Sequence, residues 1–182
     1  MNEREFYEVC YDRYKHEQSQ ADAIYQRAGI LLPSLPILGA VAYGLGRADL
    51  LVRTFTRVDI FLYVLAAGSA FACLAVSIVF LYLCILPRRD YKSLPPMREW
   101  DNWRKDYRKK FADKGAQPDE DKIGIHCLEF LKDKIVDAEN AYARLNEIRR
   151  EHFRRAMLWT ALGIGAVAFQ AMFYMLLHLQ GI

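Results

Sequence analysis

The chain has 182 residues, and its 25 Lys and Arg residues nearly balance its 22 Asp and Glu residues, which gives a formal net charge of +3. A balance this close to neutrality excludes a strongly basic nucleic-acid-binding protein, so we expect no nucleic-acid partner. The four cysteines include no Cys-x-x-Cys pair, which excludes a zinc ribbon and a thioredoxin-type redox site.

Three long apolar segments interrupt this charged sequence and contain no Asp, Glu, Lys or Arg. They cover residues 28–45, 60–86 and 156–179. A helix needs about 20 such residues to cross the hydrocarbon core of a bilayer. The sequence therefore predicts an all-α integral membrane protein with three spans, in which residues 28–86 form a transmembrane hairpin.

The polar segment 1–27 is expected to be a helix that continues into the first span. It lacks the apolar core of a cleavable signal peptide, so we expect the first span to be an uncleaved anchor. Residues that share one face recur at alternating steps of four and three, which indicates a seam of the coiled-coil type. The seam consists of Tyr7, Tyr11, Tyr14, Gln18, Ala21, Tyr25 and Ala28.

The first span contains two prolines, Pro33 and Pro36, followed by Gly39. Each proline removes a backbone donor and clashes with the preceding turn, so a kink is expected. These three residues are our candidates for a hinge or a constriction, and an ordinary proline kink is the alternative.

Small residues line one face of the second and third spans and predict close helix packing. They are Ala66, Ala70, Cys73 and Ser77 in the second span, and Ala161, Gly165 and Ala168 in the third. Gln170 lies inside the third span, where its amide is expected to form an interhelical hydrogen bond. The alternative for Gln170 is that it lines a water-filled path.

The cytoplasmic segment 87–155 begins irregularly and then predicts a short helix over 97–111. Aromatic residues fall on one face of this helix and basic residues surround them, a pattern typical of a helix in the membrane interface. The candidate site comprises Trp100, Trp103, Arg104, Tyr107, Arg108 and Phe111. Two alternatives remain: the aromatic face packs on other helices, or it stacks on a nucleotide.

A second seam with steps of three and four lies in the predicted helix 122–155, which runs into the third span. It consists of Leu128, Leu131, Ile135, Ala138, Tyr142 and Leu145. Both seam helices enter the membrane from the same side at their C-terminal ends. We therefore predict that the two helices are parallel and pack on each other, within one subunit or between subunits.

The basic residues predict the orientation of the chain. Segments 1–27 and 87–155 together contain 22 of the 25 Lys and Arg residues. Because basic residues are retained in the cytoplasm, we place both segments inside a bacterial inner membrane and the C-terminus outside. Candidate contacts to anionic lipid headgroups are the arginines that flank the spans: Arg88, Arg89, Arg149, Arg150, Arg154 and Arg155.

No catalytic constellation, metal-ligand set or glycine-rich phosphate loop is present, so we expect neither an enzyme nor a cofactor. Paired intramembrane carboxylates, which mark proton-coupled transporters, are also absent. The small-residue faces, the two seams and the prolines favour an oligomeric membrane effector or pore. The alternative is a non-conducting scaffold or accessory subunit that anchors a cytoplasmic partner.

The layout of the chain resembles a known class of proteins. A charged helix leads into two spans joined by a short connector, and a second charged helix with Asn140, Asn146 and Arg149 leads into a further span. This layout resembles the small multi-span effectors of bacterial anti-phage systems, including the SLATT-type effectors, which generally have two spans. The resemblance implies homo-oligomerisation, activation by a cytoplasmic protein or nucleotide signal, and permeabilisation of the membrane.

Overall fold

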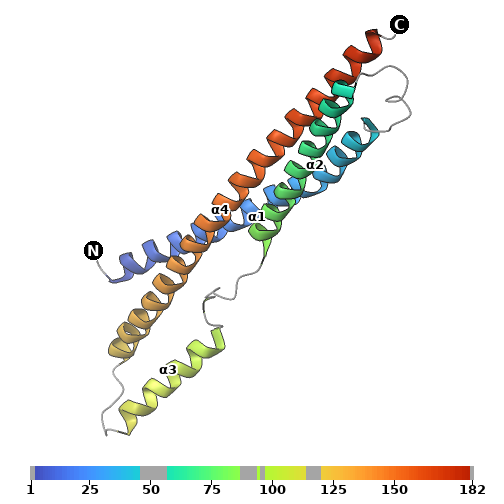
Figure 1. The fold of residues 1–182 in the computed structure, drawn as a ribbon. Helices are drawn as coiled ribbons and strands as arrows, with labels where there is room; N and C mark the ends of the chain where they lie inside the picture. Colours follow the sequence, from blue (N-terminus) through green and yellow to red (C-terminus); the bar gives the residue numbers. More distant parts are fainter. Residues whose placement is uncertain (1–2, 46–56, 87–93, 95–96, 114–119, 181–182) are drawn as a thin grey trace. The chain divides into compact units, whose positions relative to one another are not determined.

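The computed structural model describes residues 3–45, 57–86, 94, 97–113 and 120–180. These residues form four α-helices and no strand, so the all-α prediction is confirmed (Figure 1). The helices are α1 (Glu3–Leu45), α2 (Arg57–Ile85), α3 (Met97–Ala112) and α4 (Glu120–Gln180). Within the described residues, α1, α2 and α4 are long and apolar enough to cross a membrane.

The two longest helices combine charged and apolar sequence without a break. The 43-residue α1 and the 61-residue α4 each begin with charged residues and end with an apolar stretch. This continuity agrees with the prediction that both charged helices run into a span. The short helix expected over 97–111 is also present, as α3.

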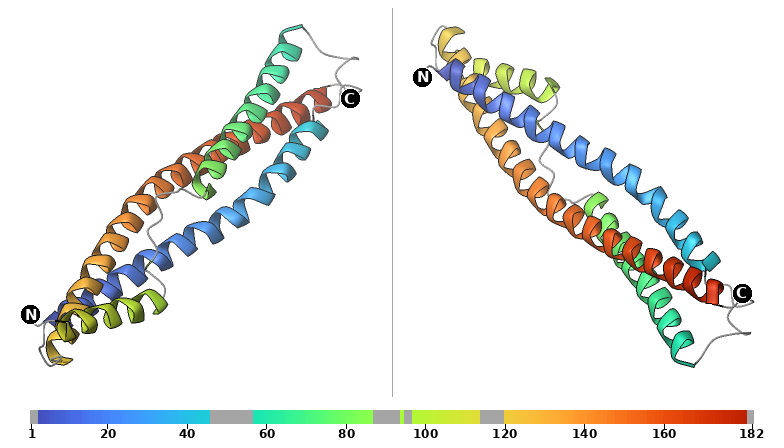
Figure 2. Two further views of the ribbon diagram at one scale, coloured as in Figure 1. Left: turned by 90° about the horizontal axis from the view of Figure 1, so that it is seen from below. Right: turned by 90° about the horizontal axis from the view of Figure 1, so that it is seen from above.

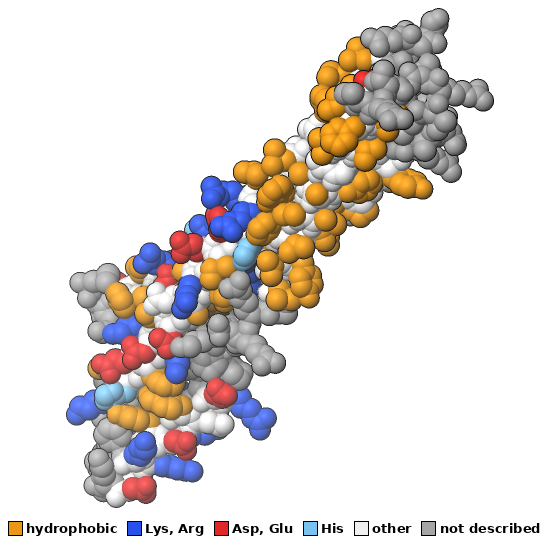
Figure 3. All heavy atoms as spheres, viewed as in Figure 1, with side chains coloured by type: hydrophobic (Ala, Val, Ile, Leu, Met, Phe, Trp, Pro, Cys, Tyr) orange, Lys and Arg blue, Asp and Glu red, His pale blue; other side chains and the backbone are white. Residues whose placement is uncertain are grey.

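The chain divides into two compact units. The first unit contains α1 up to Asp22, all of α3, and α4 up to Glu147, whereas the second contains α1 from Ala23, all of α2, and α4 from Ile148. Charged side chains are dense on the visible face of the first unit, and hydrophobic side chains cover that of the second (Figure 3). The predicted connector 46–59 lies largely outside the described residues.

The core of the first unit lies between α1 and α4. Cys10 and Tyr14 of α1 pack against Ile135, Ala138 and Tyr142 of α4, and all five are buried. The rings of Tyr14 and Tyr142 meet edge to face with centroids 5.4 Å apart, a favoured aromatic geometry. The two seams therefore pack within one chain, which confirms the intramolecular form of the prediction.

The seam on α1 is rotated slightly from its predicted position. Tyr14, Ala21 and Ala28 are buried as predicted, but Gln18 is exposed and Ile24 is buried in place of the half-buried Tyr25. A pattern with steps of three and four can be placed on the helix in two ways that share every seventh residue. The structure uses the way that buries Ile24 and leaves the larger Tyr25 half-buried. Buried positions recur every seven residues along the whole helix, at Tyr14, Ala21, Ala28, Leu35 and Ala42.

The second unit is built from helices that approach closely through small residues. Leu35, Leu74 and Leu81 pack with two fully buried alanines, Ala28 and Ala156. A second cluster joins α1, α2 and α4 through Ala42, Ala70 and Val167. Large apolar side chains cover the outside, including Ile30, Phe61, Leu162 and Met175, so this unit requires a lipid environment.

The prolines lie inside a helix that stays continuous. Pro33 and Pro36 are both within α1 and both exposed, whereas Gly39 is half-buried. Both views of Figure 2 show that α1 changes direction in its second half, as expected for a helix that lacks two backbone donors. The role of these residues as a hinge or constriction stays a prediction.

Candidate functional site

The aromatic face of α3 lies against α4 in the first unit. The Trp103 ring stacks on Phe130 with centroids 4.7 Å apart and planes 8° apart. It also stacks on Tyr107, whose ring in turn lies 5.1 Å from that of His126. This geometry supports the packing interpretation of the α3 aromatics, because the rings are engaged by the protein itself.

The basic residues of α3 are exposed. Arg104 and Arg108 are exposed, and Lys105 forms an ion pair of 2.6 Å with Asp101 that holds the pKa of this carboxyl group below its ordinary value. The side chains of Trp100 and Phe111 lie outside the described residues. The predicted site on α3 thus has aromatic residues that pack against α4 and basic residues that are exposed.

Replacing Trp103 by Ala should loosen α3 from α4. The substitution removes the stacks with Phe130 and Tyr107, and each such aromatic pair is worth about 0.5–1.5 kcal/mol beyond the buried area. We expect faster trypsin cleavage at Arg104 and Arg108 in the folded protein. The exposed neighbour Asn102→Ala is the control, and equal cleavage of both variants would contradict the packing role.

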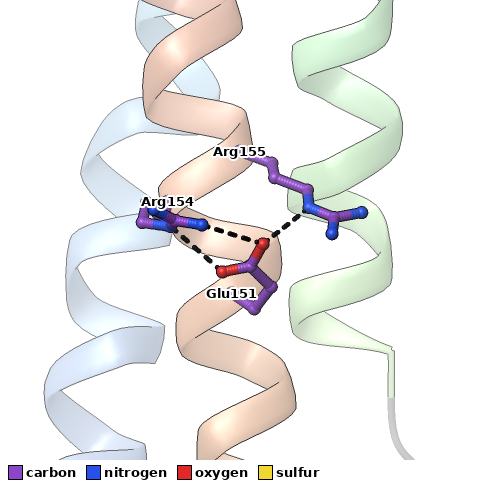
Figure 4. Close-up of polar contacts among 3 residues, drawn as sticks. All are labelled: Glu151, Arg154 and Arg155. Carbon is purple, nitrogen blue, oxygen red and sulfur yellow. Dashed lines mark hydrogen bonds and ion pairs between the residues drawn. The ribbon is translucent and has the colours of Figure 1, made fainter.

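A charged cluster lies on α4 just before its apolar stretch. The Glu151 carboxylate accepts hydrogen bonds from Arg154 at 3.0 and 3.2 Å and from Arg155 at 2.8 Å (Figure 4). These two guanidinium groups hold the pKa of Glu151 below its ordinary value. Two of the arginines predicted to contact lipid headgroups therefore share one carboxylate, and Arg88 and Arg89 lie outside the described residues.

Arg149 differs from the neighbouring arginines because its side chain is only 3% exposed. Its guanidinium group lies 4.9 Å from the centre of the Tyr25 ring, and its carbonyl accepts a hydrogen bond from the Cys84 thiol at 3.6 Å. Within the chain this arginine packs between helices. Its contact with a lipid headgroup stays a prediction. Arg150 is exposed.

Polar side chains also join the spans inside the second unit. Ser77 Oγ of α2 donates to the carbonyl of Ala156 at 3.0 Å and lies 2.7 Å from Thr160 Oγ1 of α4. Gln170 is fully buried, and its Nε2 donates to the Ala42 carbonyl of α1 at 3.4 Å. This bond is of the interhelical kind expected for Gln170.

The small residues of the two spans lie on different kinds of surface. In α2, Ala66, Ala70 and Ser77 are buried and Cys73 is half-buried. In α4, by contrast, Ala161, Gly165 and Ala168 are exposed within one chain. Packing of this α4 stripe between copies stays a prediction.

Gly163 and Asn146 form further contacts that were not foreseen from the sequence. Gly163 is buried against α2, where an added Cβ would lie 3.1 Å from Leu74 Cδ2. In the first unit the fully buried Asn146 donates from Nδ2 to the Glu17 carbonyl at 2.7 Å and to its carboxylate at 2.8 Å. Asn146 follows Leu145, the last residue of the α4 seam, and Gly163 falls on the continued spacing of that seam. This spacing could have indicated that both residues are buried.

Ligand-binding features are sparse in the described part of the chain. A hollow of about 450 Å³ in the first unit is lined by Tyr7, Glu8, Leu128 and Leu131. Among the described residues no group of three or more His, Cys, Asp or Glu side chains could hold a metal ion. The four cysteines are unpaired thiols.

Comparison with known families decides the class of this membrane protein. Residues 7–177 match the family model PycTM, the Pycsar effector protein domain. The chain belongs to this family. The match includes residues of all three spans and of both units, so the predicted resemblance to anti-phage membrane effectors is confirmed, and the family is that of the Pycsar effectors. Searches of curated proteins and of solved structures with this effector found no match.

Proposed function

We propose that this effector permeabilises the membrane in which it lies when its cytoplasmic helices receive a nucleotide signal. In this proposal it acts through a change in helix packing and not as an enzyme. Family membership supports the defence role, and the continuity of α1 and α4 supports the mechanism.

The observation that carries the proposal is that α1 and α4 each belong to both units. Tyr14 and Tyr142 pair in the first unit, and Ala42 and Gln170 pair in the second. Because both helices continue from one unit into the other, we propose that a rotation or shift of the first pair is passed along the helices to the second. No separate linker is needed to couple signal and membrane.

The signal is proposed to be a cyclic nucleotide, which is the trigger of Pycsar effectors. Two separate features of the first unit suit parts of a nucleotide: the hollow beside Tyr7 suits a base, and the exposed basic residues of α3 suit a phosphate. We propose this unit as the receiver, and a cytoplasmic protein that delivers the signal is the alternative.

We further propose that the active form is a homo-oligomer in the inner membrane, with the N-terminus inside and the C-terminus outside. The exposed stripe of Ala161, Gly165 and Ala168 on α4 would let another copy approach closely. Exposed arginines such as Arg150 would contact anionic headgroups on the cytoplasmic side. The distribution of basic residues supports this orientation.

Dye release from vesicles tests the proposal. The purified protein is reconstituted in vesicles of anionic and zwitterionic lipid that enclose a fluorescent dye, and cyclic purine and pyrimidine mononucleotides are added one at a time. We expect one of them to release dye, with the linear mononucleotides as controls. Binding of a cyclic nucleotide without release from an oligomeric sample would contradict permeabilisation and favour the non-conducting scaffold.

A further inference from the structure

The last described turn of α1 lies inside the apolar unit. It includes Ala42 and Leu45. In the hydrocarbon core of a bilayer no water competes for hydrogen bonds, so side-chain donors that reach the carbonyls of this turn hold the helices together. Ala42 is fully buried, so solvent does not reach it in the folded chain.

Side chains from the two other spans donate to carbonyls of this turn. The Tyr63 hydroxyl of α2 donates to the Leu45 carbonyl, and Gln170 Nε2 of α4 donates to the Ala42 carbonyl at 3.4 Å. Both donors are buried, since Tyr63 is 3% exposed and Gln170 is 0% exposed. The end of α1 is thus capped by one residue from each neighbouring helix.

The chemistry of Gln170 indicates a role beyond filling space. Its Oε1 is buried and has no hydrogen-bond partner among the described residues. A leucine or methionine would fill a similar volume without leaving an acceptor unsatisfied. Buried polar groups that are only half satisfied add little stability, and their best-established use is to fix the register between helices.

The position of the cap matches such a role. Upstream of it, Pro33 and Pro36 each remove a backbone hydrogen bond from α1, so the helix backbone holds its own end less firmly. The small residues Ala42 and Ala70 bring α1 and α2 close together beside the cap. Contacts from α2 and α4 therefore determine where the end of α1 lies.

We propose that Tyr63 and Gln170 form a polar latch that holds the end of α1 against α2 and α4 and thereby keeps the three spans closed. Release of the latch lets the end of α1 move away and starts the permeabilisation, a step that rests on the proposed function. The latch itself is a property of the folded chain and can be measured without any leakage.

The latch is tested by disulfide crosslinking between α1 and α4. Ala42 and Val167, which share a buried cluster, are changed to Cys in a background that lacks the four native cysteines. Tyr63→Phe removes only the hydroxyl, and Gln170→Leu removes only the amide. Each variant should shift the equilibrium between the latched and the released position of α1 about threefold, the usual effect of one interhelical hydrogen bond, and should slow crosslinking in membranes in proportion to the latched fraction that is lost.

Ser69→Ala is the matched control, because Ser69 is exposed on α2 and donates only to the Ala66 carbonyl of its own helix. It should leave crosslinking unchanged. Thermal melts in detergent verify that all variants are folded, and the more conservative Gln170→Asn replaces Gln170→Leu if that variant does not fold.

Leakage of dye-filled vesicles gives the second measurement. Slower crosslinking together with raised leakage in the absence of a signal supports the latch. Unchanged crosslinking overturns it, and so does slower crosslinking with normal triggered leakage and no rise in basal leakage. Slower crosslinking in a protein whose parent never leaks supports the latch as a packing device and instead refutes the proposed function.

Discussion

Replacing Ile135 by Ala is expected to destabilise the protein by about 2–5 kcal/mol, the range for deleting a large aliphatic side chain from a packed core. Ile135 is fully buried between α1 and α4, where it packs with Cys10, Tyr14 and Tyr142. Loss of its side chain leaves a cavity in the buried cluster through which α1 and α4 pack in the first unit. Chemical denaturation in detergent, followed by circular dichroism, measures the loss.

Ile125 provides the matched control for this substitution. It lies on the same helix and is the same residue type, but it is 54% exposed. Ile125→Ala should change stability by no more than about 0.5 kcal/mol, as is usual for surface positions. If the two variants lose equal stability, the packing of α1 on α4 described above is incorrect.

Gly163→Leu is expected to disrupt packing between α2 and α4 in the second unit. Even an added Cβ would lie 3.1 Å from Leu74 Cδ2 and 3.5 Å from Cys73 Cβ, so a full leucine side chain has no space. Overpacking of this kind typically costs about 1–3 kcal/mol. The melting temperature of the protein in detergent should fall accordingly, and dye-filled vesicles should leak without a signal if the proposed function is correct.

Gly165→Leu is the control, since it introduces the same side chain two residues away in the same helix. An added Cβ at Gly165 meets nothing within 4 Å, so the variant should melt like the parent protein. The same variant also tests the proposed contact between copies, because leucine would obstruct close approach along Ala161 and Ala168. A normal melting temperature with reduced oligomer in crosslinking experiments would support that contact.

The sequence predicted most of the fold because two features are visible in one dimension. The length of the uncharged segments identified the spans, and steps of three and four identified the seams of the charged helices that lead into them. Ile135, Ala138, Tyr142 and Leu145 were predicted as a buried face and are buried. These features depend on local spacing, which a single sequence contains in full.

The residues of the packed membrane interface were predicted less well. In α4 the small residues Ala161, Gly165 and Ala168 were chosen by size, but the buried face consists of Ala156, Thr160, Gly163, Val167 and Gln170. Continuing the steps of three and four from Leu145 would have reached this face. In an apolar segment composition no longer distinguishes inside from outside, because lipid accepts the same side chains as a helix neighbour does.

The contacts of the polar groups could not be derived from spacing at all. The cap on α1 requires Tyr63 and Gln170, from two other helices, to meet the carbonyls of Ala42 and Leu45. Likewise, Trp103 was recognised as part of an aromatic face, but its partner Phe130 lies on another helix. Such pairings depend on how helices are rotated about their axes, and one sequence does not contain that information.

The heptad spacing of buried residues in α1, from Tyr14 to Ala42, restricts how this gene can change in length. A single inserted codon would turn everything downstream by about 100° and expose the residues that now face α4. Loss of seven codons would turn it by only about 20°. Natural variants of this helix should therefore differ in length by whole heptads, or carry a matching insertion in α4.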